Sequence, residues 1–325
     1  MKRILVTGSS GSLGSLIVEK LRKNPEYQVV GIDFNPEVMG IPTTQFHVDL
    51  TNQQSVEDFF LENWLPFDYV IHCAATIYGV AGFNENGYKI LSNDLVMTIN
   101  LLNNLTTEKF IYLSSSMVYE RSGYEPGRGV TEESLLNGKA PKTGYGLSKY
   151  TGEALVREWA NSNDKNVFTI WRPFNIITPY EESQKELGYS HVFADFFNNI
   201  LVKKLNPIPI IGDGYQVRCF TWIDDVADAI VDNLEIPATD NQDFNIGNPE
   251  PLSMRKFGQL IYDEGVQRGY LPDDELRFTT QMYIENDVRY RAPDISKAKN
   301  LLKFEPTVNT KEAIRLCMNE WEKNL

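Results

Sequence analysis

The chain has 325 residues, enough for about two domains or for one large α/β domain with an appended lobe. Hydrophobic residues make up 42% and charged residues 23%, which excludes a disordered chain and a disulfide scaffold. The net charge of −13 argues against nucleic acid as a partner, because an acidic surface repels phosphate backbones. The three cysteines and three histidines are scattered, so we expect no metal site and a reducing, cytoplasmic compartment.

The first half of the chain alternates strand and helix patterns. Apolar runs predict strands at residues 4–6, 29–33, 46–49, 69–72, 110–113 and 167–171. Helical spacing of apolar residues predicts helices at 13–21, 56–61, 91–105 and 146–161. No apolar run approaches 18 residues, so no membrane span is expected. This alternation predicts a Rossmann-type, doubly wound parallel sheet with helices on both faces.

The pattern changes near residue 176, where prolines separate short strands and short helices. We therefore expect a dinucleotide-binding domain over residues 1–175 and a smaller, irregular substrate-binding lobe over 176–325, lying over the sheet. A segment near 219–245 is expected to return to the first domain.

The phosphate loop follows the first predicted strand. Its glycines, Gly8, Gly11 and Gly14, have the spacing GxxGxxG, which allows a tight turn and close approach of backbone N–H groups to a pyrophosphate. An ordinary strand-to-helix turn would give a similar pattern, but Asp33 ends the second strand, where a carboxylate binds ribose hydroxyls. Because Asp33 would repel a 2′-phosphate and no Arg follows it, NAD is favoured over NADP.

A candidate catalytic group combines Tyr145 and Lys149 with a serine cluster at 114–116. Tyr145 and Lys149 are four residues apart and share a helix face, so the ammonium is expected to lower the pKa of the phenol towards neutrality. Tyr145 would then act as a general base. A surface helix pair and a serine-rich turn are the simpler interpretations of these two segments taken singly.

These segments occur in an order that resembles the extended short-chain dehydrogenases/reductases, specifically the nucleotide-sugar epimerase/dehydratase group. The resemblance rests on residues 7–14, 33, 49–50, 72–75, 114–119, 145–149, 172–175, 212–218, 220–226, 244–247 and 293–298. It therefore covers nearly the whole chain and implies an NAD-dependent enzyme acting on a nucleoside-diphosphate sugar.

The resemblance also implies roles for single residues. The catalytic residues would be Ser115, Tyr145 and Lys149. The cofactor would contact Gly8, Gly11, Ser12, Leu13, Gly14, Asp33, Asp49, Leu50, Cys73, Ala74, Ala75, Asp94, Tyr145, Lys149 and Phe174. The substrate would contact Ser115, Ser116, Asn175, His191, Val192, Arg218 and Arg289. The similar proteins often have Asn where this chain has Asp94. The resemblance does not distinguish Arg289 from Arg291 as the residue that makes the second phosphate contact.

The reaction is narrowed by the two residues that follow Ser115. Ser116 and Met117 stand where dehydratases, decarboxylases and 3,5-epimerases of the group carry an acid, a base or a cysteine. The preferred interpretation is a 4-epimerase similar to UDP-glucose 4-epimerase, which oxidises C4 to a transient 4-keto sugar and reduces it again. A 4-dehydrogenase or 4-keto reductase, a dehydratase or decarboxylase, and a non-catalytic dinucleotide sensor remain as alternatives.

The resemblance further implies a homodimer formed through the helices at 91–105 and 146–161. Val96, Leu101, Leu105 and Leu155 are the apolar residues considered for that contact. The other interpretation is that both helices only cover the sheet.

Overall fold

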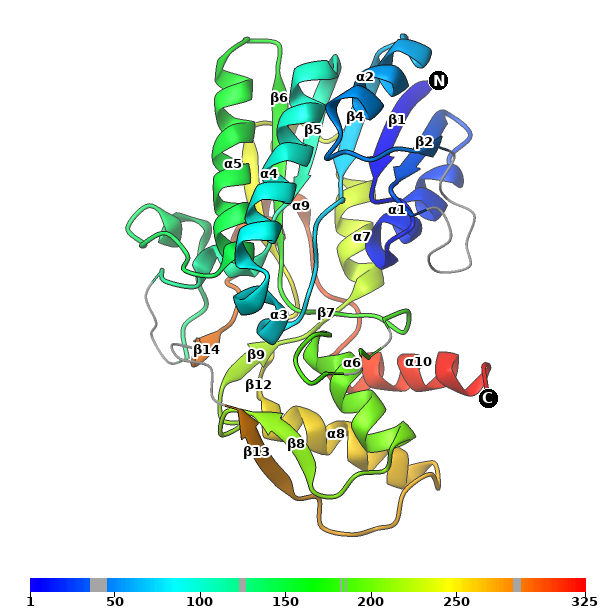
Figure 1. The fold of residues 1–325 in the computed structure, drawn as a ribbon, viewed down its shortest axis with the longest axis vertical. Coiled ribbons are helices and arrows are strands. Elements are labelled where there is room, and N and C mark those ends of the chain that lie inside the picture. Colours follow the sequence, from blue (N-terminus) through cyan, green and yellow to red (C-terminus); the bar gives the residue numbers. More distant parts are fainter. Residues whose placement is uncertain (36–45, 123–126, 182, 185, 283–287) are drawn as a thin grey trace.

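The computed structural model describes residues 1–35, 46–122, 127–181, 183–184, 186–282 and 288–325. Within these ranges the main sheet has seven parallel strands, in the order β11-β6-β5-β4-β1-β2-β3 (Figure 1). The strands of this sheet are β1 (Lys2–Thr7), β2 (Tyr27–Asp33), β3 (Phe46–His47), β4 (Phe67–His72), β5 (Thr107–Leu113), β6 (Val167–Pro173) and β11 (Gln242–Ile246). The predicted Rossmann-type fold is confirmed.

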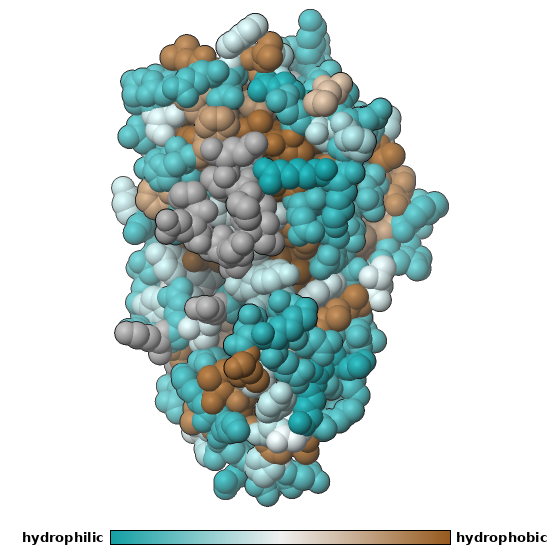
Figure 2. Space-filling model, turned by 90° about the vertical axis from the view of Figure 1, so that its right-hand side faces the viewer, coloured by the Kyte–Doolittle hydropathy of each residue, from teal (hydrophilic) through white to brown (hydrophobic). Residues whose placement is uncertain are grey.

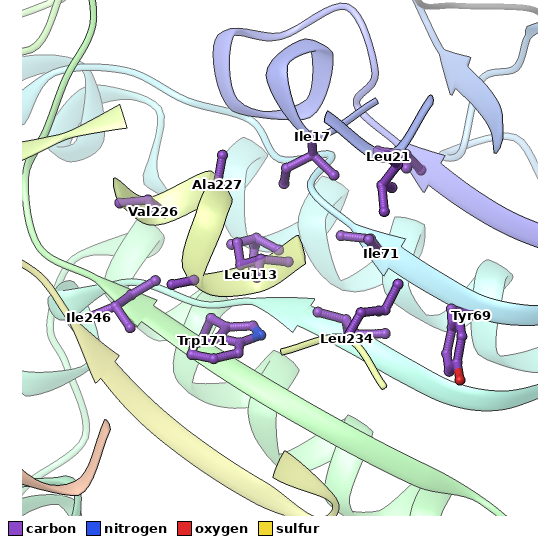
Figure 3. Packing of buried hydrophobic residues seen from close by; sticks show 14 of the residues in the cluster. Ile17, Leu21, Tyr69, Ile71, Leu113, Trp171, Val226, Ala227, Leu234 and Ile246 are labelled. Carbon is purple, nitrogen blue, oxygen red and sulfur yellow. The ribbon is translucent and has the colours of Figure 1, made fainter. Parts of the chain in front are cut away.

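Alternate side chains of each strand enter two different cores. Ile4 and Val6 of β1 join one core, and Leu5 between them joins the other, because successive strand residues point to opposite faces. The first core lies under α1 (Ser12–Arg22), α7 (Ile223–Asp232) and α9 (Ser296–Leu302). Figure 3 shows Ile17 and Leu21 of α1 and Val226 and Ala227 of α7 in one cluster with strand residues such as Trp171. The second core lies under α2 (Gln53–Glu62), α4 (Gly87–Asn104) and α5 (Gly144–Asn161).

The smaller lobe lies beyond the carboxyl ends of the strands, not over a face of the sheet as the sequence pattern suggested (Figure 1). Its own core packs together α6 (Val192–Phe197), the π-helical turn Asn198–Val202, α8 (Met254–Gln267) and α10 (Thr310–Glu322). The remaining strands of the described residues are short: β7 (Ile176–Ile177), β8 (Ile208–Ile211), β9 (Val217–Cys219), β10 (Thr221–Trp222), β12 (Pro251–Ser253), β13 (Phe278–Met282) and β14 (Tyr290–Arg291). The chain returns to the main layer at α7 and β11, which pack on α1 and β6.

Two local differences from the predicted elements have simple causes. The strand predicted at 46–49 is only Phe46–His47, because β3 is an exposed edge strand with one neighbour. A further short helix, α3 (Val80–Glu85), lies between β4 and α4. Glycines at 79 and 82 interrupt the apolar spacing there, which is why no helix was predicted.

Most of the described surface on one side of the molecule is hydrophilic (Figure 2). Figure 2 shows the side of the molecule that lies to the right in Figure 1, and its described residues are mainly hydrophilic, with hydrophobic ones in separate small groups. Among the described residues, no helix is both long and apolar enough to cross a membrane.

Candidate active site

The loop between β1 and α1 brings three backbone segments into close contact. Gly8 has a φ of +67°, and a Cβ at this position would lie 2.7 Å from the backbone nitrogen of Ala74. A Cβ on Gly14 would collide with the carbonyl group of Gly8. Glycine at both positions therefore lets α1 start directly against β1, with Gly11 as its N-cap residue. The N-terminal N–H groups of α1 thus open towards the ends of the strands, an arrangement that suits a phosphate.

Asp33 and Asp49 border this loop. Asp33 ends β2, and its carboxylate accepts hydrogen bonds from the backbone N–H of Ser10 at 2.9 Å and of Asn35 at 2.9 Å. Asp49 is fixed in the same way by Thr51, and Leu50 beside it is buried. Asp33 is therefore held against the glycine loop, where ribose hydroxyls could reach it.

A cavity of 250 Å³ extends from the glycine loop across the ends of β4, β5 and β6. Many of the predicted site residues line it: Gly8, Gly11, Ser12, Leu13, Gly14, Cys73, Ala75, Ser115, Ser116, Tyr145, Lys149, Asn175 and His191. The structure thus brings the phosphate loop and the predicted catalytic residues to one cavity, as expected for groups that follow neighbouring parallel strands.

Tyr145 and Lys149 are placed by the start of α5. Thr143 caps this helix by accepting a hydrogen bond from the N–H of Gly146 at 3.1 Å. Lys149 Nζ donates to the carbonyl oxygen of Leu113 at 3.0 Å and lies 5.9 Å from the centroid of the Tyr145 ring. Ser115 is the second residue after β5, whose last residue, Leu113, is the one that Lys149 contacts, and the Ser115 hydroxyl accepts a hydrogen bond from the N–H of Met117 at 3.2 Å.

The electrostatics of this pair differ from the sequence expectation. Burial raises the pKa of Tyr145 to about 12, although the hydrogen bond with Ser115 and the charge of Arg291 oppose the rise. Burial also lowers the pKa of Lys149, and Asp94 is the largest opposing influence. The expected fall of the Tyr145 pKa towards neutrality is therefore not seen, because the loss of hydration outweighs the nearby cations.

A second cavity of 280 Å³ lies between the sheet and the smaller lobe. Arg218 and Val192 line it, and both are residues that the sequence assigned to substrate. The two cavities meet at residues that line both of them: Phe83, Met117, Asn175, Ile176, His191 and Arg291. Of these two cavities, the predicted catalytic residues line only the first, and the shared residues Met117 and Phe83 contact Ser115 and Tyr145.

The structure separates the two arginines that the sequence could not rank. Arg291 is 7% exposed, lines both cavities, and places Nη1 on the Met117 sulfur and Nη2 3.3 Å from Asn175 Oδ1. Arg289 lines neither cavity and forms a bidentate pair with Asp213 at the surface. Of the two, Arg291 is the one placed to reach a ligand.

Several predicted cofactor residues lie behind the cavity wall. Phe174 is wholly buried in a cluster with Val118 and Tyr119, and does not line either cavity. Asp94 is 3% exposed and faces the backbone of Thr76 and the hydroxyl of Ser148. Both residues support the site from outside it.

Phe83 is a site residue that the sequence did not indicate. It comes from α3, and its ring stacks on that of Tyr145 with centroids 4.4 Å apart and an interplanar angle of 2°. An aromatic residue on an unpredicted helix carries no local signal of this contact, which only the fold creates.

A family model described as "NAD dependent epimerase/dehydratase family" matches residues 4–247 of the chain. The chain belongs to the NAD-dependent epimerase/dehydratase family. It is therefore an enzyme of the epimerase/dehydratase type, and its cofactor is NAD. The glycine loop that excludes a Cβ and the adjacent Asp33 carboxylate fit this cofactor.

Relatives match this family member over almost its whole length. A "Putative UDP-glucose 4-epimerase" of Methanocaldococcus jannaschii is 32% identical, with 99% of this chain and 98% of the relative covered. The structure of UDP-glucose 4-epimerase of Thermotoga maritima with UDP-glucose is 26% identical, with a TM-score of 0.83 and 99% of each chain covered. A UDP-glucuronic acid 4-epimerase of Bacillus cereus, solved with UDP-glucuronic acid and NAD, is 26% identical, with a TM-score of 0.80, covering 99% of this chain and 100% of the other.

Proposed function

We propose that this protein is an NAD-dependent nucleoside-diphosphate-sugar 4-epimerase. The observation that carries the proposal is that Ser115, Tyr145 and Lys149 line one cavity, and that this cavity shares six lining residues with a second, arginine-containing cavity. In this proposal the first cavity holds the cofactor, with Asp33 and the glycine loop at its far end. The second holds the nucleotide sugar, with Arg218 and Arg291 at the diphosphate.

Three residues of the chain have separate roles in the proposed reaction at C4 of the sugar. NAD, when bound, supplies the reversible two-electron oxidation and, in its oxidised form, a positively charged ring. Tyr145 takes the proton of the C4 hydroxyl, and Ser115 donates a hydrogen bond to the C4 oxygen. Lys149, fixed on the Leu113 carbonyl, places a positive charge beside the phenol, which favours the deprotonated state that the base needs.

The neighbouring side chains favour epimerisation over reactions at C5 or C6. Ser116 and Met117 follow the catalytic serine and line the cofactor cavity, and neither side chain can act as a strong acid or base there. Phe83, Met117 and Ile176 form an apolar part of the junction of the cavities. Beside these apolar side chains, a 4-keto sugar could rotate to present its opposite face while few hydrogen bonds to the protein are broken, and the two arginines would hold its diphosphate.

Product analysis tests this proposal directly. The NAD-loaded protein is incubated with UDP-glucose, UDP-N-acetylglucosamine and UDP-glucuronic acid, and products are identified by NMR. A C4 epimer without accumulation of NADH is the expected result. NADH formed in proportion to an oxidised sugar would overturn the epimerase proposal in favour of a dehydrogenase, and loss of water or carbon dioxide would favour a dehydratase or decarboxylase.

We also propose that two copies associate through α4 and α5. These helices pack on each other, and Val96 and Ile99 remain 39% exposed on the outer face of α4. Leu101, by contrast, is buried in the core of its own chain and is not available for a partner. Light scattering at micromolar concentration should give a dimer mass, and a monomer mass would contradict this proposal.

A further inference from the structure

Asp94 lies at the contact between three parts of the site. The N-termini of α4 and α5 approach so closely that a Cβ on Gly144 would collide with the backbone of Gly87. Two turns further along α4, Asp94 Oδ1 accepts a hydrogen bond from the N–H of Thr76 at 2.8 Å. Its Oδ2 accepts one from the hydroxyl of Ser148 at 2.9 Å. Thr76 belongs to the segment after β4 that walls the cofactor cavity, and Ser148 precedes Lys149.

The backbone of Asp94 is fixed from the opposite side. Thr98 Oγ1 donates to the Asp94 carbonyl at 2.9 Å and contacts His72 Nε2 at 3.3 Å, while His72 Nδ1 contacts Thr7 Oγ1 at 2.7 Å. Burial lowers the pKa of His72 to about 3, so the ring is neutral. Because the Thr98 proton goes to the carbonyl, His72 carries its own proton on Nε2 and accepts from Thr7. A continuous set of hydrogen bonds thus joins the end of β1 to Asp94.

We propose that Asp94 is a positioning residue: its buried carboxylate fixes the Tyr145–Lys149 turn against the cofactor wall and balances the charge of the Lys149 ammonium. The proposal rests on the proposed function only for the role of Tyr145 as the base.

Among the described groups around Lys149, Asp94 is the one that we assign to balance the charge of the ammonium. His72 and Cys73 at the end of β4 are neutral, because burial lowers the pKa of His72 to about 3 and raises that of Cys73 to about 12. Tyr112 of β5 is also neutral, because burial raises its pKa well above the usual value. Glu153, one turn along α5, pairs with Arg172 of β6 at 2.6 Å. Arg291 of β14 is a cation, and α3 presents the uncharged Phe83.

The charge of Asp94 acts on both catalytic groups in the same direction. It raises the pKa of Lys149 against the effect of burial, and it adds to the rise in the pKa of Tyr145 that burial causes. Activity requires the Tyr145 phenolate and the Lys149 ammonium, so one limb of the pH profile follows the titration of Tyr145 and the other follows the titration of Lys149. Removing the carboxylate charge should therefore move both limbs of the pH profile to lower pH.

The substitution Asp94→Asn removes the negative charge of the side chain and keeps its size and its capacity for hydrogen bonds. An asparagine can still accept from Thr76 through Oδ1, and its Nδ2 can donate to Ser148, whose proton then goes to the Tyr145 carbonyl oxygen that already lies 2.9 Å away. Ser148→Ala is the matched control, because it removes a contact and leaves the carboxylate. Asp94→Ser is a second neutral variant for the case in which Asp94→Asn folds poorly.

The holoenzyme variants are compared by the pH profile of kcat/KM and by ultraviolet titration of Tyr145, taken as the difference from the same protein carrying Tyr145→Phe. In Asp94→Asn and Asp94→Ser both limbs, and the Tyr145 titration, should move to lower pH by about one unit. Ser148→Ala should lower kcat/KM without moving either. Unchanged limbs and an unchanged titration in the neutral variants would overturn the proposal. The titration needs no turnover, so it decides the role of Asp94 even if no sugar nucleotide proves to be a substrate.

Discussion

The proposed cofactor half of the site is formed by residues at the ends of β1, β4, β5 and β6. The proposed substrate half, by contrast, is formed mainly by short segments of the smaller lobe. In the first half, each group follows a buried strand of one parallel sheet, so its position is set by the sheet. In the second half, Arg218 and Arg291 come from strands of three and two residues, and the two arginines are 73 positions apart in sequence. The comparison teaches that the cofactor half is positioned by the layers of one sheet, whereas the substrate half is positioned by short segments that are far apart in the chain.

The two halves are also joined by backbone contacts at α3. The N–H of Gly79 donates to the carbonyl oxygen of Tyr189 at 2.7 Å, and the N–H of Ala81 donates to that of Gly188 at 2.9 Å. Phe83 on the same helix stacks on Tyr145. Substitutions in each half should therefore separate cofactor binding, substrate binding and chemistry, with α3 affecting the last of these.

The largest effect is expected where both halves meet. Tyr145→Phe removes the phenol oxygen and keeps the ring that stacks on Phe83. Turnover should fall by at least about a hundredfold, the size typical of a lost general base, while NAD remains bound. Steady-state kinetics and the NAD content of the purified protein measure the two quantities. A variant that keeps more than about a hundredth of the rate would show that Tyr145 is not the base.

The cofactor half is tested at its glycines. In Gly14→Ala the new Cβ would collide with the Gly8 carbonyl, so NAD affinity should fall by about a hundredfold, the upper range for overpacking. Gly87→Ala is the control, because its Cβ would lie 3.6 Å from the backbone of Gly144, an ordinary contact, and Gly87 lines neither cavity. NAD affinity is measured by calorimetry on cofactor-stripped protein. Equal affinities of the two variants would contradict the packing argument.

The substrate half is tested by the two neighbouring arginines. Arg291→Met should raise KM for the nucleotide sugar by about tenfold or more, because a charge-assisted hydrogen bond contributes about 1.5–3 kcal/mol, and should leave NAD affinity unchanged. Arg289→Met removes the surface pair with Asp213 and should change KM by less than about twofold. If Arg289→Met had the larger effect on KM, the assignment of Arg291 to the diphosphate would fail.

The smallest effect is expected at the contact between the halves. Phe83→Leu keeps an apolar residue over the Tyr145 ring and removes the stacking, which is about 0.5–1.5 kcal/mol for an aromatic pair. We expect kcat to fall by about twofold to tenfold, with NAD affinity maintained. A loss of NAD affinity without a change in kcat would mean that Phe83 supports the cofactor cavity and not the base.

Local sequence signals were sufficient for the cofactor half. The glycine spacing, the carboxylate at the end of β2 and the apolar runs act within a few residues of one another, and the structure places them as one loop on a parallel sheet. The pairing of Tyr145 with Lys149 on one helix face is likewise a property of helix geometry, four residues apart. The sequence did not show how deeply this half is buried. Burial places Phe174 and Asp94 behind the cavity lining and raises the pKa of Tyr145 to about 12.

By itself, the sequence determined the alternation of strands and helices, the phosphate loop, the serine, tyrosine and lysine of the site, and the absence of an acid or base at Met117. These follow from hydrophobic periodicity and from backbone constraints that act locally. Only the tertiary structure decided that Arg291 and not Arg289 lies at the junction of the cavities, that Phe83 covers Tyr145, and that Asp94 faces the catalytic turn. Those facts depend on burial and on contacts between residues far apart in the chain, which no spacing along the sequence encodes.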